Sequence, residues 1–423
     1  MNAPVSSVSE MKQTKPCGQR VWVVSELYYP ELTSTGYFLT GIAEGLAETY
    51  DVSVLCGQPS YWARGERAAS RETRNGVDVQ RCWATTLDKN KMLFKLINLI
   101  TISLSIFLAA LIRVRRNDVL IAVTNPPPLP YLAALACRIR GARFVVLVHD
   151  VYPEVLTRLG VLKPGSVFVK LLDRASRRLY EGADRIVVVG RDMRILVTEK
   201  LRSRKERVVI GTNWANTEGI VPQLRSESQL LEDLNLKSQF VVQLWGNMGR
   251  PHNVEDIVDA AQLLASDPSL HFVMIGWGTK RPWVVAEKQR RGLENITVLE
   301  PFPRKDSCKV QNGCDIAINA LSSGLTGVSV PSRSYNAMAA GKPLLAICDS
   351  DSELAAMVGE EEIGWVVPPG RPDLIASALL EAKSNPDRLH AMGERARKAA
   401  ETRYTGRYVL QVYKNIIEEL RAE

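Results

Sequence analysis

Short runs of β-branched and apolar residues alternate with helical stretches along almost the whole chain, and no other feature restricts the fold as strongly. Strands of about five residues separated by helices are typical of βαβ units, which build parallel sheets with helices on both faces. The alternation comes in two series, so we expect two doubly wound domains. The length agrees with this, because 423 residues exceed the usual size of one domain.

The two series set the expected domain boundaries. Residues 20–207 are predicted to form the first domain and residues 237–400 the second, joined by a polar, turn-rich linker over residues 208–236. Residues 1–19 form a polar tail, which we expect to be disordered, and residues 401–423 carry a final helix whose apolar face must cover another surface. The predicted strands are Val21–Ser25, Val52–Cys56, Val119–Val123, Phe144–Val148, Ile186–Val189, Val241–Trp245, Phe272–Ile275, Ile296–Leu299, Ile316–Ala320 and Pro343–Ile347, and the predicted helices are Tyr37–Thr49, Val254–Ala265, Ser334–Ala340 and Tyr408–Arg421.

The charge balance is basic and the cysteines are scattered. The 54 Lys and Arg against 46 Asp and Glu give a formal net charge of +8, which suits an anionic membrane surface, a phosphorylated substrate or a nucleic acid. The 7 cysteines form no CxxC pair, so we expect reduced thiols and no disulfide framework. With 4 His and no Cys/His cluster we expect no metal site. The N-terminus lacks the apolar core of an export signal, which indicates a cytoplasmic protein.

One apolar stretch, Leu96–Ile112, contains no charged residue over 17 positions and is bordered by Lys and Arg on both sides. Its length is at the lower limit for a helix that spans a bilayer. A span would leave the strands before and after it on opposite sides of the membrane, so we expect a crossover helix of the first domain. Asn98, Thr101 and Ser105 give it only a narrow polar stripe. Two interpretations remain: the helix lies in the interface of an anionic membrane, which we favour, or it is fully buried.

In open parallel sheets, ligands bind where strands end and helices begin. The first such loop ends in Ser34, Thr35 and Gly36, just before a predicted helix whose first backbone N–H groups would suit an anion. His149 and Asp150 follow another predicted strand, where they could orient a hydroxyl, accept a proton or stabilise positive charge. A structural interpretation stands beside this one, in which the histidine satisfies a buried backbone carbonyl.

The second series repeats the arrangement. Glycines follow two consecutive predicted strands, in the turn Gly246–Arg250 and in Gly276–Gly278, and Arg250 offers guanidinium donors for phosphate oxygens. A Gly- and Ser-rich segment, Ser322–Asn336, then leads into a helix of small residues, and Asn336 could hydrogen-bond paired hydroxyls such as those of a ribose. The alternative interpretation is a tight helix–sheet contact that requires small side chains.

Together these residues resemble the family 4 retaining glycosyltransferases of the GT-B fold, whose two Rossmann-like domains face each other across a cleft. The resemblance extends from about residue 20 to residue 415. It is carried by the Gly36 loop, His149-Asp150, the Gly246–Arg250 turn, Gly276-Trp277-Gly278 and the segment Tyr335–Pro343. The segments His149–Glu154 and Gly327–Gly341 are similar to the bacterial branch that builds exopolysaccharide and O-antigen repeat units, which includes fucosaminyltransferase-like members.

The resemblance implies a nucleotide-sugar donor bound mainly by the second domain, UDP-sugar in preference to GDP-sugar, and an acceptor bound by the first. It assigns donor binding to Gly36, Gly246, Asn247, Arg250, Gly276, Phe302, Pro303, Ser329, Ser332 and Asn336, of which Phe302 and Pro303 would flank the base. It assigns catalysis to His149 and Asp150, with His149 on the transferred sugar or the acceptor hydroxyl, and acceptor binding to Ser34, Thr35 and Glu154. In such enzymes the final helix crosses back onto the first domain.

Two features depart from the family pattern. Val328 and Asn336 stand where the family has two glutamates eight positions apart, and no lysine follows shortly after Arg250, where His252 and Asn253 stand instead. The family also implies retention of the anomeric configuration, with no bound divalent metal and no cofactor besides the donor. Charge on the leaving group would be stabilised by Arg250 and by helix N-termini.

The leading hypothesis is a peripheral enzyme of the inner membrane that transfers a sugar, on the cytoplasmic side, to a polyprenyl-diphosphate-linked saccharide. It accounts for the two sheets, the phosphate-type loops, the basic charge and the Leu96–Ile112 helix. A catalytically silent GT-B scaffold in a polysaccharide assembly complex is the alternative that the missing glutamates favour, and a nucleotide-sugar epimerase is a third. Nucleic-acid binding is the weakest alternative, because the basic residues are dispersed and are not clustered with aromatics.

Overall fold

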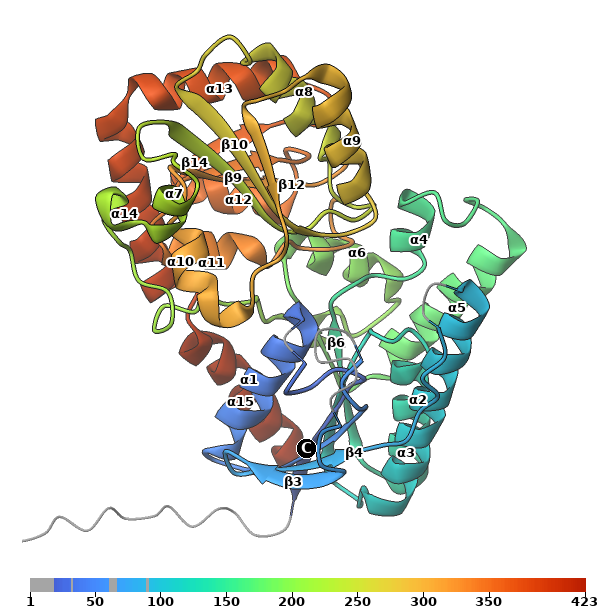
Figure 1. The fold of residues 1–423 in the computed structure, drawn as a ribbon. Helices are drawn as coiled ribbons and strands as arrows, with labels where there is room; N and C mark the ends of the chain where they lie inside the picture. The colour runs from blue at the N-terminus through green and yellow to red at the C-terminus, as the bar shows by residue number, and fades with distance from the viewer. Residues whose placement is uncertain (1–18, 32, 61–66, 89–90) are drawn as a thin grey trace, which may run out of the picture. The chain divides into compact units, whose positions relative to one another are not determined.

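A computed structural model describes residues 19–31, 33–60, 67–88 and 91–423, so all of the predicted tail except Gln19 lies outside the described residues. The chain forms two sheets of mainly parallel strands with helices packed against them, which confirms the predicted α/β fold class (Figure 1). It divides into two compact units, which do not coincide with the two sheets. The first unit comprises the chain up to Ala122, Tyr131–Phe144 and Ile417–Glu423, and the second comprises Val123–Pro130 and Val145–Ile416.

The elements of the first sheet and its helices are β1 (Arg20–Val24), α1 (Ser34–Ala47), β2 (Asp51–Cys56), β3 (Arg71–Arg74), β4 (Val77–Arg81), α2 (Met92–Arg113), β5 (Val119–Val123), α3 (Leu129–Arg140), β6 (Arg143–Val148), α4 (Glu154–Arg158), α5 (Val167–Gly182), β7 (Arg185–Val188), α6 (Arg191–Lys200), η1 (Lys205–Arg207) and β8 (Val208–Ile210). The elements that follow are η2 (Arg225–Glu227), α7 (Gln229–Asp233), β9 (Phe240–Asn247), α8 (Glu255–Leu263), β10 (Leu270–Trp277), α9 (Arg281–Arg291), β11 (Ile296–Leu299), η3 (Arg304–Asp306), α10 (Ser307–Gln311), β12 (Ile316–Ala320), α11 (Arg333–Ala339), β13 (Leu344–Ile347), α12 (Glu353–Glu360), β14 (Gly364–Val367), α13 (Pro372–Ser384), α14 (Pro386–Thr402) and α15 (Gly406–Ala422).

The first sheet has eight strands in the order β3-β4-β2-β1-β5-β6-β7-β8. β1 pairs in parallel with β2 on one side and with β5 on the other, and β2 pairs in parallel with β4. Strands β1, β2, β5 and β6 are buried almost from end to end. Parallel strands covered on both faces need apolar side chains at every position, which is why the sequence shows them as uninterrupted apolar runs.

The edge of this sheet carries a hairpin that the apolar runs did not predict. β3 and β4 pair in antiparallel orientation, and β4 alternates between buried and less buried residues. Asn75 and Gly76 between them both have positive φ angles, 45° and 78°, which suit the tight two-residue turn that Asn-Gly favours. The Asn-Gly pair therefore marks the turn of this hairpin in the sequence. Its two strands could not be predicted from apolar runs, because strands with one exposed side have no continuous apolar run.

The predicted linker is wrong at its first residues. Val208–Ile210 form β8, which pairs in parallel with β7 and adds an edge strand to the first sheet. The first series therefore ends at β8 and not at Ile186–Val189. Three residues are too few to give a periodic pattern, so the strand could not be distinguished from a loop in the sequence alone.

The second sheet has six parallel strands in the order β11-β10-β9-β12-β13-β14. Helices α8, α9 and α13 cover one face, and α7, α10, α11, α12 and α14 contribute to the apolar cluster on the other (Figure 1). β9 lies in the interior of the sheet, between β10 and β12, so the loops that follow these three strands begin at the same edge. This edge is where the sequence placed the glycine turns.

The end of the chain packs within the first unit. The Tyr50 hydroxyl donates a hydrogen bond to Glu418 in α15 at 3.4 Å, and Arg421 donates one to the Gln19 carbonyl at 3.0 Å. The Arg421 guanidinium also lies 4.6 Å from the centre of the Tyr50 ring. The apolar Ile417 and Leu420 of α15 are buried, and the last turns of the helix contact residues from the beginning of the chain within the first unit.

α2 is the crossover helix between β4 and β5. It is long and apolar enough to span a membrane by length and composition alone. However, β4 and β5 belong to the same sheet, with only β2 and β1 between them, so the strands before and after α2 are not separated by a bilayer. The predicted crossover is therefore confirmed.

The inner face of α2 combines the buried Ile102 and Ile106 with polar side chains, whereas its outer face is apolar. Asn98, which is 7% exposed, accepts hydrogen bonds from the Thr85 hydroxyl and the Leu87 backbone N–H at 2.7 and 3.1 Å and donates one to the Leu87 carbonyl at 2.9 Å. The Thr101 hydroxyl accepts one from the Thr85 backbone N–H at 3.2 Å. We call the opposite face the outer stripe; it consists of Leu96, Ile100, Leu104, Leu108 and Ile112, which are 40–79% exposed. The interpretation of α2 as a fully buried helix is therefore wrong.

Lysine substitutions should distinguish the two faces of α2. Ile106 is 1% exposed, so Ile106→Lys would place an unpaired charge in the core and should lower the free energy of unfolding by about 3–5 kcal/mol. Leu104 belongs to the outer stripe, and Leu104→Lys should change it by less than about 0.5 kcal/mol. Urea denaturation followed by circular dichroism measures both values. Equal losses in the two variants would mean that the outer stripe is packed against protein.

Candidate functional site

The glycine turns lie at the carboxyl ends of β9 and β10, within the second unit. Gly246 and Gly276 are direct partners in the parallel pairing of these strands. A Cβ atom on Gly276 would lie 1.9 Å from the Gly246 carbonyl oxygen, and the φ angle of Gly276 is +143°. Only glycine fits both conditions. The close approach of the two strands is therefore sufficient to explain Gly276, to which the family resemblance assigns donor binding.

Arg333, at the start of α11, lies against the Gly246 turn. Its Cζ is 3.3 Å from the position of a Cβ on Gly246, and its Nη2 donates to the Asn247 carbonyl at 2.9 Å and lies 2.8 Å from His252 Nε2. Its Nη1 is buried and has no hydrogen-bond partner among the described residues. Burial lowers the pKa of Arg333 to about 10, so the side chain is still a cation at neutral pH. Burial and the charges of Arg333 and Lys280 lower the pKa of His252 well below its ordinary value, so His252 is neutral there.

Arg333 is a site residue that the sequence patterns do not predict. The family lysine is absent after Arg250 and His252 stands nearby, but no local pattern indicates that an arginine 81 positions away contacts that histidine. The available signal was weak: Arg333 is the only charged residue in the segment Ser322–Asn336. A single arginine in a Gly- and Ser-rich loop is also common on ordinary surfaces.

Arg250 itself lies on the exposed side of the same turn. Its backbone carbonyl accepts a hydrogen bond from Ser322 Oγ at 3.5 Å, and the Pro251 carbonyl accepts one from the Ser322 backbone N–H at 2.8 Å. Its side chain is exposed and forms no ion pair with any described residue. Arg250 and Arg333 therefore bring two guanidinium groups to one turn, and no carboxylate of the described chain pairs with either.

Buried and exposed carboxylates hold the loop that follows β12. Asp349 accepts hydrogen bonds from Ser323 Oγ at 3.1 Å and from the Gly324 backbone N–H at 2.7 Å. Asp192 accepts one from the Gly327 backbone N–H at 2.9 Å and another from the Glu353 backbone N–H at 3.0 Å. These contacts define the path of the loop before it reaches Ser329, Ser332 and α11.

Asp150 and Val151, which follow His149, contact the same loop. The Thr124 hydroxyl oxygen accepts hydrogen bonds from the backbone N–H groups of both residues, at 3.1 and 3.2 Å. The Asp150 carboxylate is hydrogen-bonded to Ser329, and the Val328 carbonyl accepts a hydrogen bond from the Val151 backbone N–H at 3.2 Å. Burial lowers the pKa of His149 to about 4 and raises the pKa of Asp150 to about 6. At neutral pH the histidine is therefore neutral and the aspartate is charged.

The structure explains the departure from the family at Val328. This residue is 0% exposed and packs with Val155 and Leu325 in a small apolar cluster. A glutamate there would bury a charge among aliphatic side chains. Asn336, at the second departing position, is half-buried in α11 and follows Arg333 by less than one turn.

Several other predicted site residues have structural contacts. Phe302 is partly buried and packs, like Trp245, against an apolar cluster of the second sheet, and Pro303 follows it before η3. Glu154 forms an ion pair with the buried Lys200 at 2.5 Å, which gives it a role in holding α4 against α6.

Among the described residues, no group of three or more His, Cys, Asp or Glu side chains is arranged to hold a metal ion.

Ser34, Thr35 and Gly36 belong to the first unit and begin α1. The Gly36 backbone N–H donates to the hydroxyl of Thr33, the residue that caps the helix, at 3.3 Å. A Cβ on Gly36 would lie 2.5 Å from the Glu31 carbonyl oxygen, so packing requires glycine at this position. The Gly36 N–H, which was expected to bind an anion, is therefore already hydrogen-bonded to Thr33.

Two family descriptions together match most of the chain. Residues 35–214 match the family described as "Glycosyl transferase 4-like domain", and residues 229–399 match "Glycosyl transferases group 1". The chain is a GT4-type glycosyltransferase. It is similar to the probable glycosyltransferase WbjE of Pseudomonas aeruginosa, with 36% identity over 273 residues that cover 64% of this chain and 67% of the relative.

A second relative and a solved structure extend the comparison. This glycosyltransferase is 24% identical over 352 residues to the putative colanic acid biosynthesis glycosyl transferase WcaI of Escherichia coli strain K12, covering 78% of this chain and 83% of the relative. Its fold is similar to that of Anabaena HepE in complex with UDP-glucose, with a TM-score of 0.71 and 15% identity over 96% of this chain and 100% of that one. The predicted GT-B fold is confirmed.

Asp150→Asn should stabilise this glycosyltransferase at neutral pH and have little effect in acid. Because the pKa of Asp150 is raised from 3.8 to about 6, the stability that this group contributes is fully present below pH 3.8 and is lost as the pH rises through 6. Removing the charge should raise the free energy of unfolding at pH 7.5 by on the order of 2 kcal/mol and leave it nearly unchanged at pH 4. Urea denaturation at the two pH values measures this. A variant that is less stable at pH 7.5 would contradict it.

Proposed function

We propose that this glycosyltransferase transfers a sugar from a nucleoside diphosphate sugar, a UDP-sugar in preference to a GDP-sugar, to a polyprenyl-diphosphate-linked saccharide in cell-surface polysaccharide biosynthesis. Two comparisons support the proposal: WcaI is named for colanic acid biosynthesis, and HepE was solved with UDP-glucose. The observation that carries it is the pair of arginines at the Gly246 turn, Arg250 and Arg333, which have no carboxylate partner among the described residues.

The donor diphosphate is proposed to bind at this turn. A diphosphate offers several anionic oxygens, and guanidinium groups bind such oxygens through paired, charge-assisted hydrogen bonds. Arg250 would reach the diphosphate from the exposed side, and Arg333 would donate through Nη1, which has no partner among the described residues. The exposed Asn247 amide would add a further donor. Arg333 thereby replaces the family lysine that is missing after Arg250.

The rest of the donor is proposed to follow the family assignment. The backbone of Ser329–Ser332 would complete the phosphate site, and Asn336 would hydrogen-bond the ribose. Phe302 and Pro303 would flank the base. Asn336 lacks the charge of the family glutamate, so its contribution to ribose binding would be smaller than that of a charged acceptor.

The chemical step is proposed to proceed with retention and without a bound divalent ion. As the bond between the anomeric carbon and the diphosphate oxygen breaks, negative charge develops on the leaving group, and the preorganised guanidinium groups of Arg250 and Arg333 would stabilise it. His149 is neutral at pH 7 and would act as a hydrogen-bonding group that positions the transferred sugar or the acceptor hydroxyl. Asp150, fixed by Ser329, would hold His149 and the loop in register.

The acceptor is proposed to be lipid-linked because the outer stripe of α2 faces away from the protein. Basic residues border the stripe, with Lys91 and Lys95 before it and Arg113, Arg115 and Arg116 after it. An apolar face between cationic ends suits the interface of an anionic membrane. The enzyme would then act as a peripheral protein on the cytoplasmic side of the inner membrane, where lipid-linked saccharides are accessible.

A catalytically silent scaffold is a second candidate that one observation favours. Val328 stands where the family has a glutamate and packs in an apolar cluster, so its surroundings suit an aliphatic side chain and not a charged one. The scaffold would bind UDP without transferring sugar. Purified protein that binds UDP tightly but hydrolyses and transfers no sugar from a panel of UDP-sugars would support this candidate over the enzyme.

Arg333→Gln should weaken UDP binding at least tenfold, because one charge-assisted hydrogen bond is worth about 1.5–3 kcal/mol. UDP should raise the melting temperature of the wild-type protein, and titration of that shift measures affinity. Arg290→Gln is the matched control, since Arg290 is exposed and pairs with Glu287 outside the site. Equal affinity of the wild type and Arg333→Gln would remove Arg333 from the donor site.

His149→Ala should abolish most sugar transfer and leave UDP binding within about twofold of the wild type, because the histidine is proposed to contact the sugar or acceptor and not the diphosphate. Arg250→Ala should lower both transfer and UDP affinity. Transfer is measured with radiolabelled UDP-sugar and a lipid-linked acceptor extract. Near-normal turnover of either variant would remove that residue from its assigned role.

A further inference from the structure

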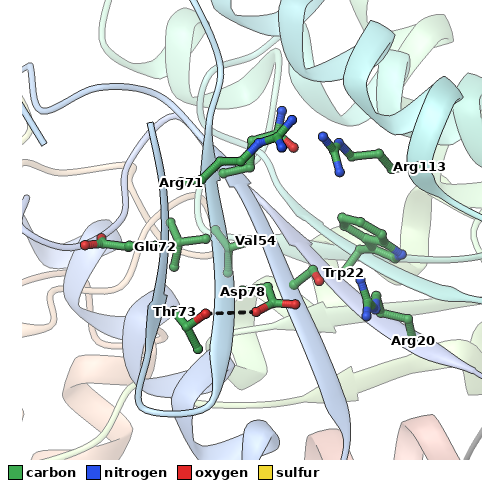
Figure 2. A pocket seen from close by; sticks show the side chains of 11 residues that line it. Arg20, Trp22, Val54, Arg71, Glu72, Thr73, Asp78 and Arg113 are labelled. Carbon is green, nitrogen blue, oxygen red and sulfur yellow. Dashed lines mark hydrogen bonds between the residues drawn. The ribbon is translucent and has the colours of Figure 1, made fainter. Parts of the chain in front are cut away.

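The first unit contains a pocket that the proposed reaction does not use. It has a volume of about 370 Å³ and opens on the first sheet, at β1, β2, the β3–β4 hairpin and the last residue of α2 (Figure 2). Five charged side chains and a tryptophan are among those that line it: Arg20, Trp22, Arg71, Glu72, Asp78 and Arg113. The volume is within the range of small-molecule sites. Arg20 is the first residue of β1, so the pocket lies toward the amino ends of the strands, away from the loop that leads into α1.

Two of the five charged side chains that line this pocket, Arg20 and Glu72, are already paired. Arg20 donates to Asp51 through two nitrogens, at 2.9 and 2.7 Å, and Glu72 accepts from the buried Arg81 at 2.6 Å. Asp78 accepts a hydrogen bond from the Thr73 hydroxyl at 3.2 Å but pairs with no cation among the described residues. These contacts leave Asp78 as the one lining carboxylate without a cationic partner in the described part of the chain.

Arg71 and Arg113 differ from Arg20, the third arginine that lines the pocket. Neither side chain forms an ion pair or hydrogen bond with a described residue, and Figure 2 shows the two pointing toward one another, away from the Asp78 side of the pocket. Two guanidinium groups that face each other repel unless an anion lies between them. Each also presents a planar set of donors that matches phosphate oxygens. The arrangement therefore favours a phosphate group bound between Arg71 and Arg113.

The position of the pocket indicates the source of the phosphate. Arg113 follows Ile112 directly, and Ile112 is the last and, at 79%, the most exposed residue of the outer stripe of α2. Trp22 and Val54 give the pocket an apolar side next to the arginines. An amphiphile with an anionic phosphate satisfies both features, because its head would occupy the pocket while its chains continue along the outer stripe.

We infer that this pocket binds the phosphate of an anionic phospholipid from the membrane that covers the outer stripe of α2. The inference rests on the membrane contact included in the proposed function. It adds a lipid preference to that contact: the enzyme would distinguish anionic from zwitterionic membranes through Arg71 and Arg113, beyond the general attraction of its basic surface.

The experiment compares binding of the full chain to sedimented vesicles of phosphatidylcholine alone and of phosphatidylcholine with phosphatidylglycerol. Binding is measured at high salt, where attraction between exposed charges is screened. Arg71→Gln with Arg113→Gln is the test variant. Arg67→Gln with Arg138→Gln is the matched control, since it removes two exposed positive charges of the first unit that neither line the pocket nor border the outer stripe.

The wild type and the control should prefer the phosphatidylglycerol vesicles at high salt, and the test variant should lose that preference by at least tenfold. Equal preference in the test and control variants would overturn the inference. Inorganic phosphate that stabilises the wild type but not the test variant, together with no vesicle preference, would also overturn it, because the pocket would then bind free phosphate.

Two parallel measurements separate this inference from the proposed function. Leu104→Lys with Leu108→Lys should lose binding to both kinds of vesicle; if it binds like the wild type, α2 does not contact the membrane and the lipid pocket is overturned with it. UDP-induced stabilisation should be the same in the wild type and in the pocket variant. A wild type that UDP does not stabilise contradicts the proposed donor site and leaves the vesicle result standing on its own.

Discussion

The close approach of the β9 and β10 ends is the constraint on which the candidate site depends. With Gly246 and Gly276 in register, the backbones approach more closely than any Cβ atom would permit. The same absence of a side chain on Gly246 leaves room for the Arg333 guanidinium, which anchors on the Asn247 carbonyl. A side chain at either glycine would therefore disturb the sheet edge and displace the cation that the donor is proposed to meet.

The loop after β12 connects this turn to the His149–Asp150 pair. It begins at Ser322, which is hydrogen-bonded to the Arg250–Pro251 backbone, and it reaches Asp150 through Ser329. Carboxylates accept its backbone N–H groups along the way, so the loop needs no regular secondary structure to hold its path. Two motifs that are 100 positions apart in the chain are thereby joined through one segment.

α2 has an apolar outer face, while its inner face combines the buried Ile102 and Ile106 with polar side chains. On the inner face, Asn98 and Thr101 hydrogen-bond the backbone of the half-buried Thr85 and Leu87. Its outward face is aliphatic. In water this arrangement exposes apolar area at a cost in free energy, whereas against lipid the same area is stabilising. Arg113, the last residue of α2, has no ion-pair partner among the described residues, which agrees with an anionic surface beside it.

The sequence alone was enough to determine the parallel sheets, because buried strands need uninterrupted apolar runs, and to locate the glycine turns, because strand ends and helix starts have local signals. It did not determine β8 or the β3–β4 hairpin, whose short or half-exposed strands carry little periodicity. Only the tertiary structure decided that Arg333 meets His252, that Glu154 belongs to a buried ion pair, and which face of α2 is outside. Such contacts join residues that are distant in the chain, so they cannot be predicted from local composition or from the spacing of residues within one segment.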